Sequence, residues 1–313
     1  MILEDNVLHE IKQIILKENI SSCLINLKGH SIIQYYQNQK MTEKLYNINS
    51  ITKSVLSILI GIAIDRGELE GTHIPISNYF PNISQDKKNI TIEHLLTMSP
   101  GFEWGEFGKW GGKPTPMIDS EDWVDFILKR EMEQNPGEKM YYNSGCSHLL
   151  SAILQKVTNE KTATYAEKVL FEPLNITNYR WFDDPKGISI GGFGLQLKSE
   201  DLLKIGELML RKGKWGTNQI VSETWITSST TPKLHTYHDI GTYGYHWWIL
   251  LDENGKVYYP SIYFALGYGG QYIIISPLHE LVVVFTRHKY KNTFGPNGLL
   301  GFFRETILKG ISN

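Results

Sequence analysis

The sequence has little of three features that mark whole classes of protein: cysteine, net charge and long apolar runs. Its two cysteines, Cys23 and Cys146, are too few for a disulfide framework, so we expect a reducing compartment. Its 31 basic and 33 acidic side chains leave a net charge of -2, which provides no basic field to attract nucleic acid or an anionic membrane. The longest apolar stretch, residues 55–64, is about half as long as a bilayer span requires.

The N-terminus also lacks a recognisable export signal. Two of its first five residues are acidic, and no basic segment is followed by the apolar segment that a secretory signal peptide contains. We therefore expect a cytoplasmic protein whose partners are small molecules, with neither a nucleic-acid nor a membrane partner.

The order of the hydrophobic patterns predicts an α+β protein. Apolar residues at helical spacing open the chain, and an almost wholly apolar helix is predicted over residues 54–65. Strand-like runs lie near both ends, and helical patterns separated by Gly- and Pro-rich loops lie between them. We interpret residues 1–70 and 240–313 as one sheet domain, with a mostly helical domain, residues 71–239, inserted into it. Two independent domains are the alternative.

The first candidate for catalysis is the pair Ser50 and Lys53. One helical turn separates them, so the lysine can reach the serine hydroxyl, and burial beside the apolar helix would lower the pKa of the lysine. The Ser50 N–H at a helix N-terminus would also suit an oxyanion. An ordinary helix start explains the same spacing. Ser84 and Lys87 repeat the pattern in a polar loop without an apolar helix, which predicts a solvated turn.

Two further segments are candidates for the same site. Tyr142 follows a Pro-Gly turn and precedes a predicted helix, a position from which a tyrosine can transfer protons if a cation lies nearby. Packing is the plainer explanation, and Tyr141 fits the Y-x-N pattern as well. The glycine-rich segment that ends at Gln271 lies between two strand-like runs, where an edge could bind substrate main chain. A bulge or tight turn would explain it equally.

A competing hydrolase motif, G-x-S-x-G, surrounds Ser189. A nucleophile elbow needs a strand before the serine and a helix after it, but more glycines follow here, and these form helices poorly. We therefore interpret Ser189 as structural. The ten histidines form no H-E-x-x-H pattern, and we expect neither a metal nor another cofactor.

Taken in order, S-x-x-K, Y-x-S and the glycine-rich strand segment resemble the motifs of the penicillin-recognising serine hydrolases. The resemblance is greatest to their class C β-lactamase branch, especially family VIII carboxylesterases and 6-aminohexanoate-dimer hydrolase-like enzymes. It is carried over nearly the whole chain by SITKSVLSILIGIAIDRGEL, ITIEHLLTMSPG, NPGEKMYYNSG, GGFGLQLKSEDLLKIGELML, YGYHWWI and GYGGQYIIISP. It implies a β-lactamase/transpeptidase-like fold: a five-stranded antiparallel sheet flanked by terminal helices, a helical domain, and an active site between the two.

The resemblance also implies roles for individual residues. Ser50 would be the acylated nucleophile, Lys53 its proton acceptor and Tyr142 the third catalytic residue. The oxyanion hole would be formed by the N–H groups of Ser50 and Gln271. The implied oxyanion and substrate-binding residues are Gln271, Gly270, Gly269, Tyr268 and Ser144.

Two departures from the family pattern bear on the substrate. Tyr268 stands where a lysine or histidine usually helps to receive a substrate carboxylate, and Ser144 replaces an asparagine. Both favour small esters or amides over penicillins. We therefore expect a serine hydrolase that works through an acyl-enzyme on Ser50. The alternatives are a D-amino-acid peptidase, a weak β-lactamase, or a catalytically silent, penicillin-binding-like module for peptides, which the intact Ser50, Lys53 and Tyr142 disfavour.

Overall fold

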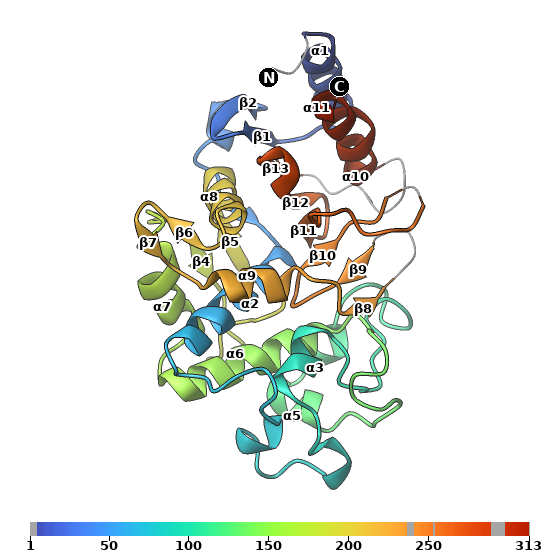
Figure 1. Ribbon diagram of the computed structural model, residues 1–313. Helices are drawn as coiled ribbons and strands as arrows, with labels where there is room; N and C mark the ends of the chain where they lie inside the picture. The colour runs from blue at the N-terminus through green and yellow to red at the C-terminus, as the bar shows by residue number, and fades with distance from the viewer. Residues whose placement is uncertain (1–4, 237–240, 253, 289–297, 313) are drawn as a thin grey trace.

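An antiparallel sheet joins the two ends of the chain in the computed structural model, which describes residues 5–236, 241–252, 254–288 and 298–312 (Figure 1). Its order is β2-β1-β13-β12-β11-β10-β9-β8. These strands are, in that order, His30–Tyr36, Ser22–Leu27, Leu281–Thr286, Gln271–Ser276, Tyr263–Gly267, Trp248–Ile249, Thr242–Tyr243 and Leu234–His235. The five longer strands correspond to the expected five-stranded sheet, and three strands of two residues extend it beyond β11.

Helices cover both faces of this sheet, which explains why every residue of its central strands β11, β12 and β13 is buried. In β13, Val282 and Val284 belong to one buried cluster, whereas Val283 and Phe285 belong to the other. Successive side chains of a strand point to opposite faces, so each cluster lies on its own side. The expected α+β class is confirmed.

The terminal helices cover one face together. α1 (Asp5–Lys17) buries Ile11 and Ile15 there and packs beside the C-terminal helical segment. That segment runs through α10 (Leu299–Phe302), the π-helical turn η6 (Phe303–Leu308) and α11 (Lys309–Ser312). Figure 1 shows the first and last helices side by side.

The opposite face of the sheet is covered by α8 (Ser199–Leu210). A Cβ at Gly206 would lie 2.5 Å from Cγ1 of Val282 and 2.9 Å from Cγ2 of Ile273, so glycine allows this close approach. This helix lies within the range that the sequence predicted as a helical insertion. The domain boundaries themselves stay a prediction.

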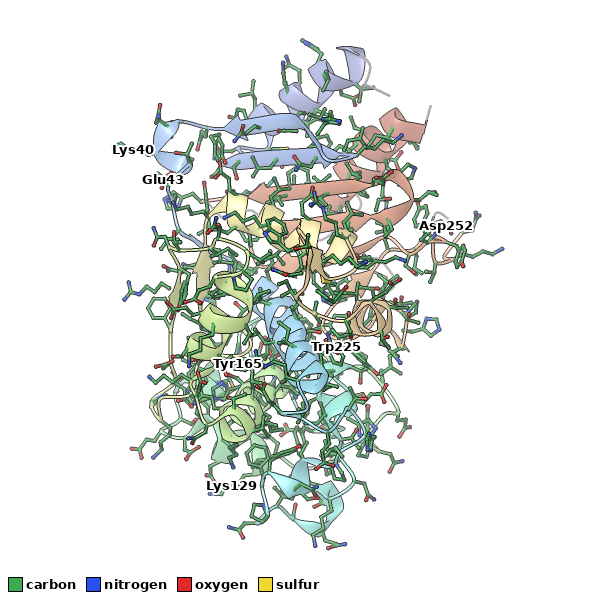
Figure 2. The ribbon with its side chains drawn as sticks, turned by 60° about the vertical axis from the view of Figure 1, so that its left-hand side comes forward. Lys40, Glu43, Lys129, Tyr165, Trp225 and Asp252 are labelled. Atoms are coloured by element: carbon green, nitrogen blue, oxygen red, sulfur yellow. The ribbon has the colours of Figure 1, made fainter. Side chains whose placement is uncertain are left out.

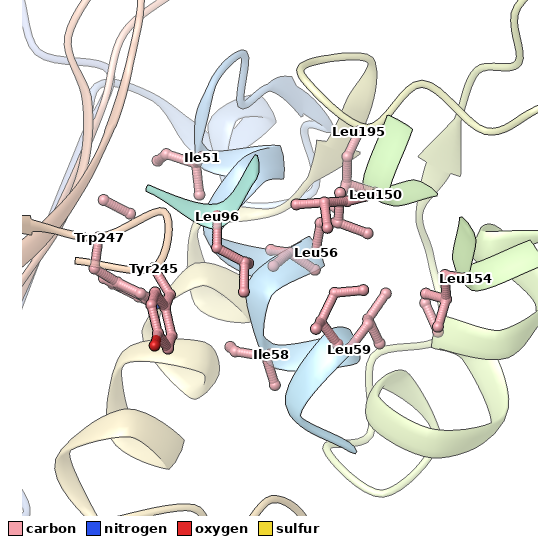
Figure 3. Close-up of a cluster of buried hydrophobic side chains, with 14 of the residues drawn as sticks. Ile51, Leu56, Ile58, Leu59, Leu96, Leu150, Leu154, Leu195, Tyr245 and Trp247 are labelled. Atoms are coloured by element: carbon pink, nitrogen blue, oxygen red, sulfur yellow. The ribbon is translucent and has the colours of Figure 1, made fainter. Parts of the chain in front are cut away.

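The apolar helix predicted from the sequence is α2 (Ile51–Asp65), and residues 51–63 are all buried. Figure 3 shows its side chains Leu56 and Leu59 against Leu150 and Leu154 of α6 (Ser144–Thr158). α9 (Glu223–Ser229) contacts α2 as well, because Trp225 lies against Gly61. Figure 2 shows Trp225 beside the helix α2. Burial of each of these large apolar side chains contributes about 1.5–3 kcal/mol, which makes α2 a rigid support for the residues at its start.

Shorter elements complete the helical region and connect it to the sheet. The helices are α3 (Ile92–Leu96), α4 (Thr115–Ile118), α5 (Trp123–Leu128), α7 (Thr162–Ala166) and the π-helical turn η4 (Glu167–Phe171). A small sheet has the order β3-β5-β4, with strands Tyr46–Asn47, Leu195–Leu197 and Arg180–Trp181, and β6 (Lys214–Trp215) pairs with β7 (Asn218–Gln219). Among the described residues, no helix has the length and apolar character needed to cross a membrane. The cytoplasmic location stays a prediction.

Candidate active site

Ser50 lies at the first turn of α2 without serving as a side-chain cap. A serine at this position usually accepts a hydrogen bond from a backbone N–H two or three residues later. The Ser50 hydroxyl makes no such bond, although its carbonyl accepts from the Lys53 N–H at 3.1 Å. The side chain is half-buried. An ordinary helix start therefore does not account for the serine, and its hydroxyl is available for other chemistry.

The amine of Lys53 lies at the centre of the site. Its Nζ is 3.2 Å from Ser50 Oγ, 3.0 Å from Ser144 Oγ and 2.6 Å from the carbonyl oxygen of Gly192. The residue is 1% exposed. Burial lowers the pKa of this lysine to about 8, against the opposing influence of Glu106 and, less strongly, Cys146. A neutral amine is therefore accessible near neutral pH.

The structure distinguishes between the two adjacent tyrosines. The ring of Tyr142 is buried, and its centroid lies 4.9 Å from Nζ of Lys53. It also stacks on Trp248 at 6.0 Å and contacts Phe107 at 4.9 Å. Tyr141 is 38% exposed, and its backbone N–H bonds to Met98. Tyr142 is thus the tyrosine that faces the candidate catalytic lysine.

Ser144 is the first residue of α6, which its neighbour Asn143 caps. The Oδ1 of Asn143 accepts from the backbone N–H groups of Gly145 and Cys146, so the asparagine caps the helix. The Ser144 side chain is buried, and its Oγ lies 3.0 Å from Nζ of Lys53. Ser144, which stands where the resembled family has an asparagine, therefore contacts Lys53.

Glu106 belongs to the same site, although sequence reasoning missed it. Its Oε1 accepts from the Ser144 hydroxyl at 2.6 Å, and its Oε2 accepts from the Ser144 N–H at 2.8 Å and from Nε1 of Trp104 at 2.9 Å. The residue is 4% exposed. The sequence has two acids in this loop, and Glu103 forms ion pairs with Lys109 and Arg130 instead. Only the presence of an acid in a segment rich in glycine and aromatic residues hinted at a buried carboxylate.

The glycine-rich segment forms the turn between β11 and β12, beside the start of α2. A Cβ at Gly267 would lie 2.2 Å from the carbonyl oxygen of Ile48, so glycine is required there. Nδ2 of Asn49 donates to the carbonyl oxygen of Tyr268 at 2.8 Å. Gly269 and Gly270 follow with positive φ angles of 85° and 94°. The turn is therefore attached to the residues that immediately precede Ser50.

Gln271 begins β12 and is fully buried. Its side-chain amide bonds to the backbone of Arg287, with Nε2 donating to the carbonyl at 2.9 Å and Oε1 accepting from the N–H at 3.2 Å. It pairs with Gly267 across the turn. Its side chain thus has a structural role, and the oxyanion role of its N–H stays a prediction.

The two competing serines lie elsewhere. Ser84 is exposed at the start of a single 3₁₀ turn, and it accepts from the buried Lys87 at 2.9 Å, beside a separate cavity of about 1050 Å³. The contact between serine and lysine therefore forms in both S-x-x-K segments, but of these two lysines only Lys53 also contacts Ser144. Ser189 is fully buried, with its hydroxyl donating to Asp183 and accepting from the N–H of Ala163. These contacts account for Ser189 as a structural residue.

Comparison with known proteins gives one family for the chain. The family model described as Beta-lactamase matches residues 33–298. The 6-aminohexanoate-dimer hydrolase of Paenarthrobacter ureafaciens is 20% identical over 293 residues, covering 86% of this chain and 73% of that protein. The resemblance inferred from the motifs is confirmed.

Solved structures agree on the fold. The penicillin binding protein from Bacillus halodurans superposes with a TM-score of 0.72 at 19% identity, covering 94% of this chain and 98% of its own. EstCE1, described as a hydrolase with promiscuous acyltransferase activity, gives a TM-score of 0.76 at 16% identity and covers 98% of both chains. Because the family model spans most of the sequence and the fold is shared throughout, the chain belongs to the beta-lactamase family of hydrolases.

Proposed function

We propose that the protein is a serine hydrolase that forms an acyl-enzyme on Ser50 and cleaves small uncharged esters or amides. The observation that carries this proposal is the 3.2 Å contact between Ser50 Oγ and Nζ of a buried Lys53 whose pKa is lowered to about 8. A serine hydroxyl needs such a base, and a lysine serves only when it can lose its proton. The same contact is the starting geometry for proton transfer.

The reaction runs in two halves. Neutral Lys53 takes the Ser50 proton as Oγ attacks the substrate carbonyl, and the resulting oxyanion accepts from the Ser50 N–H. The bond to the alkoxide or amine leaving group then breaks, and Tyr142 relays the proton held by Lys53 to that group. In the second half, a water molecule attacks the acyl-enzyme while neutral Lys53 takes one of its protons. The bond to Ser50 Oγ then breaks, the acid is released, and the proton passes from Lys53 to Ser50 Oγ.

We retain the N–H of Gln271, the first residue of β12, as the candidate for the second oxyanion donor. The hydrogen bond between the Tyr268 carbonyl oxygen and Asn49, the residue next to Ser50, attaches the glycine-rich turn to the start of α2 and supports this choice.

The surroundings of the site support an uncharged substrate. Tyr268 is 54% exposed beside Asn49, and Phe107 is 46% exposed beside Tyr142. Exposed aromatic rings bind apolar groups and offer no cation for a carboxylate. The relative named a 6-aminohexanoate-dimer hydrolase supports amide cleavage, and EstCE1 supports an acyl-enzyme that an acceptor other than water can also resolve.

Covalent labelling tests the proposal directly. Wild-type protein treated with a fluorophosphonate should gain one adduct in intact-mass spectrometry, and peptide mapping should locate it on Ser50. The Ser50→Ala variant should gain none, whereas the matched control Ser189→Ala should be labelled like the wild type. An adduct on Ser189 would overturn the assignment, and an unlabelled wild type would favour the silent peptide-binding module.

A further inference from the structure

The buried carboxylate of Glu106 determines the direction of a chain of hydrogen bonds that ends at Ser50. A serine hydroxyl can donate or accept, so its direction depends on its partners. A carboxylate only accepts, and the Ser144 hydroxyl donates to Oε1 of Glu106 at 2.6 Å. The single proton of the Ser144 hydroxyl is therefore committed to Glu106. Toward Lys53, the same oxygen can act only as an acceptor.

In its neutral form, the amine of Lys53 has two N–H bonds and one lone pair. Two of its three neighbours, the Gly192 carbonyl oxygen and Ser144 Oγ, must accept, at 2.6 Å and 3.0 Å. Both N–H bonds are used in this way, so the lone pair faces the third neighbour, Ser50 Oγ. This is the orientation that proton abstraction requires.

We propose that Glu106 is a positioning residue that acts through Ser144 to aim the lone pair of Lys53 at the Ser50 hydroxyl. This inference rests on the proposed function and identifies a residue for the same site. It also gives a reason for the serine that replaces asparagine. An asparagine side chain can present its carbonyl oxygen to the lysine without help, whereas a serine needs a fixed acceptor behind it.

The charge of Glu106 has a second effect on Lys53. The groups that face the lysine come from several elements: Glu106 from the loop after α3, Tyr142 from the segment before α6, Cys146 from the first turn of α6, and His246 from the turn between β9 and β10. Burial raises the pKa of the Cys146 thiol and lowers that of His246 to about 3, so both are neutral near pH 7. The carboxylate of Glu106 raises the pKa of Lys53, and removing its charge lowers that pKa.

The variant Glu106→Gln separates the positioning role from simple packing. Oε2 receives two N–H donors, from Ser144 and Trp104, so the amide oxygen should take that place. The amide NH₂ would then donate to Ser144 Oγ, and the serine proton would turn to the lone pair of Lys53. We expect the plateau of kcat/KM to fall by about 10²-fold while its acid limb moves to lower pH.

The experiment measures pH profiles of kcat/KM with a p-nitrophenyl ester, together with melting temperatures. Glu103→Gln is the matched control from the same loop and should keep both the plateau and the acid limb. An E106Q variant with a wild-type profile would overturn the inference. If the activity of E106Q falls only to the extent that its melting temperature falls, and its acid limb stays in place, then Glu106 has a purely structural role.

Two further variants keep the test decisive. In a Ser144→Ala background, E106Q should change the plateau by less than about twofold, because the mediating hydroxyl is gone. If E106Q does not fold, Ser144→Ala alone should lower the plateau, and it should leave the acid limb nearly in place because Glu106 keeps its charge; an unchanged plateau would refute the inference. If the fluorophosphonate labels the wild type on Ser50 but the Glu106 variants keep the wild-type pH profile, only this inference is contradicted. If the wild type is not labelled at all, the proposed function is contradicted.

Discussion

The Nζ of Lys53 lies 2.6 Å from the carbonyl oxygen of Gly192, a residue 139 positions further along the chain. This contact joins the start of α2 to the loop before β5. A carbonyl oxygen can only accept, so it holds one N–H of the amine away from Ser50. The lysine is thus oriented by backbone as well as by side chains.

The first prediction concerns the identity of the base. Lys53→Arg should lower kcat by about 10³-fold or more, because a guanidinium keeps its proton throughout the working pH range. Steady-state hydrolysis of p-nitrophenyl acetate measures this effect. Lys87→Arg, in the second S-x-x-K pair, is the matched control and should remain active. Near wild-type turnover by the Lys53 variant would exclude the lysine as the proton acceptor.

The second prediction is a pH dependence whose sign follows from the same lysine. Its pKa is lowered to about 8 by burial, so the amine is protonated below that value and neutral above it. Only the neutral form accepts a proton, so kcat/KM should rise with pH through about 8 and then level off. A rate profile from pH 5 to pH 10 checks this. A decline with increasing pH over the range in which Lys53 loses its proton would contradict the role.

The third prediction compares the adjacent tyrosines. Tyr142→Phe should reduce kcat by about 10²-fold, because it removes the hydroxyl proposed to deliver a proton to the leaving group. The ring is retained, so packing on Trp248 should persist and the melting temperature should change little. Tyr141→Phe alters an exposed neighbour and should keep its activity. Equal effects of the two substitutions on kcat would refute the assignment.

The fourth prediction concerns substrate charge. Short-chain p-nitrophenyl esters should be hydrolysed with a higher kcat/KM than nitrocefin, which carries a carboxylate. Tyr268→Lys should narrow this gap by supplying the cation that the glycine-rich turn lacks at this position. A wild-type preference for nitrocefin over every ester tested would show that Tyr268 does not determine selectivity.

The fifth prediction tests the packing of α8 on the sheet. Gly206→Ala should destabilise the protein by about 1–3 kcal/mol, because its Cβ would lie 2.5 Å from Val282 and force the helix outward. Gly108→Ala is the control, since the nearest atom to its Cβ would be 3.9 Å away. Thermal melts of both variants give the comparison. A stabilised Gly206→Ala would mean that the gain in helix propensity outweighs the crowding.

The sequence by itself determined those features that depend on neighbours along the chain. Ser50 and Lys53 meet because one helical turn brings residues i and i+3 together, and the composition of the following segment predicts that α2 is buried. Strand-like runs near both termini likewise predicted the sheet that joins them. Short-range geometry and hydrophobic pattern were sufficient for these conclusions.

Only the tertiary structure decided which distant residues complete the site. The Y-x-N pattern alone leaves Tyr141 and Tyr142 as alternatives, and only the resemblance to the family implied Tyr142; in the structure, the packing against Lys53 distinguishes them. Glu103 and Glu106 are two acids in one loop, but the fold directs one to surface ion pairs and the other to Ser144. The physical reason is that a buried carboxylate must find hydrogen-bond donors, and those donors come from segments whose relative positions are set by the packing of the whole core.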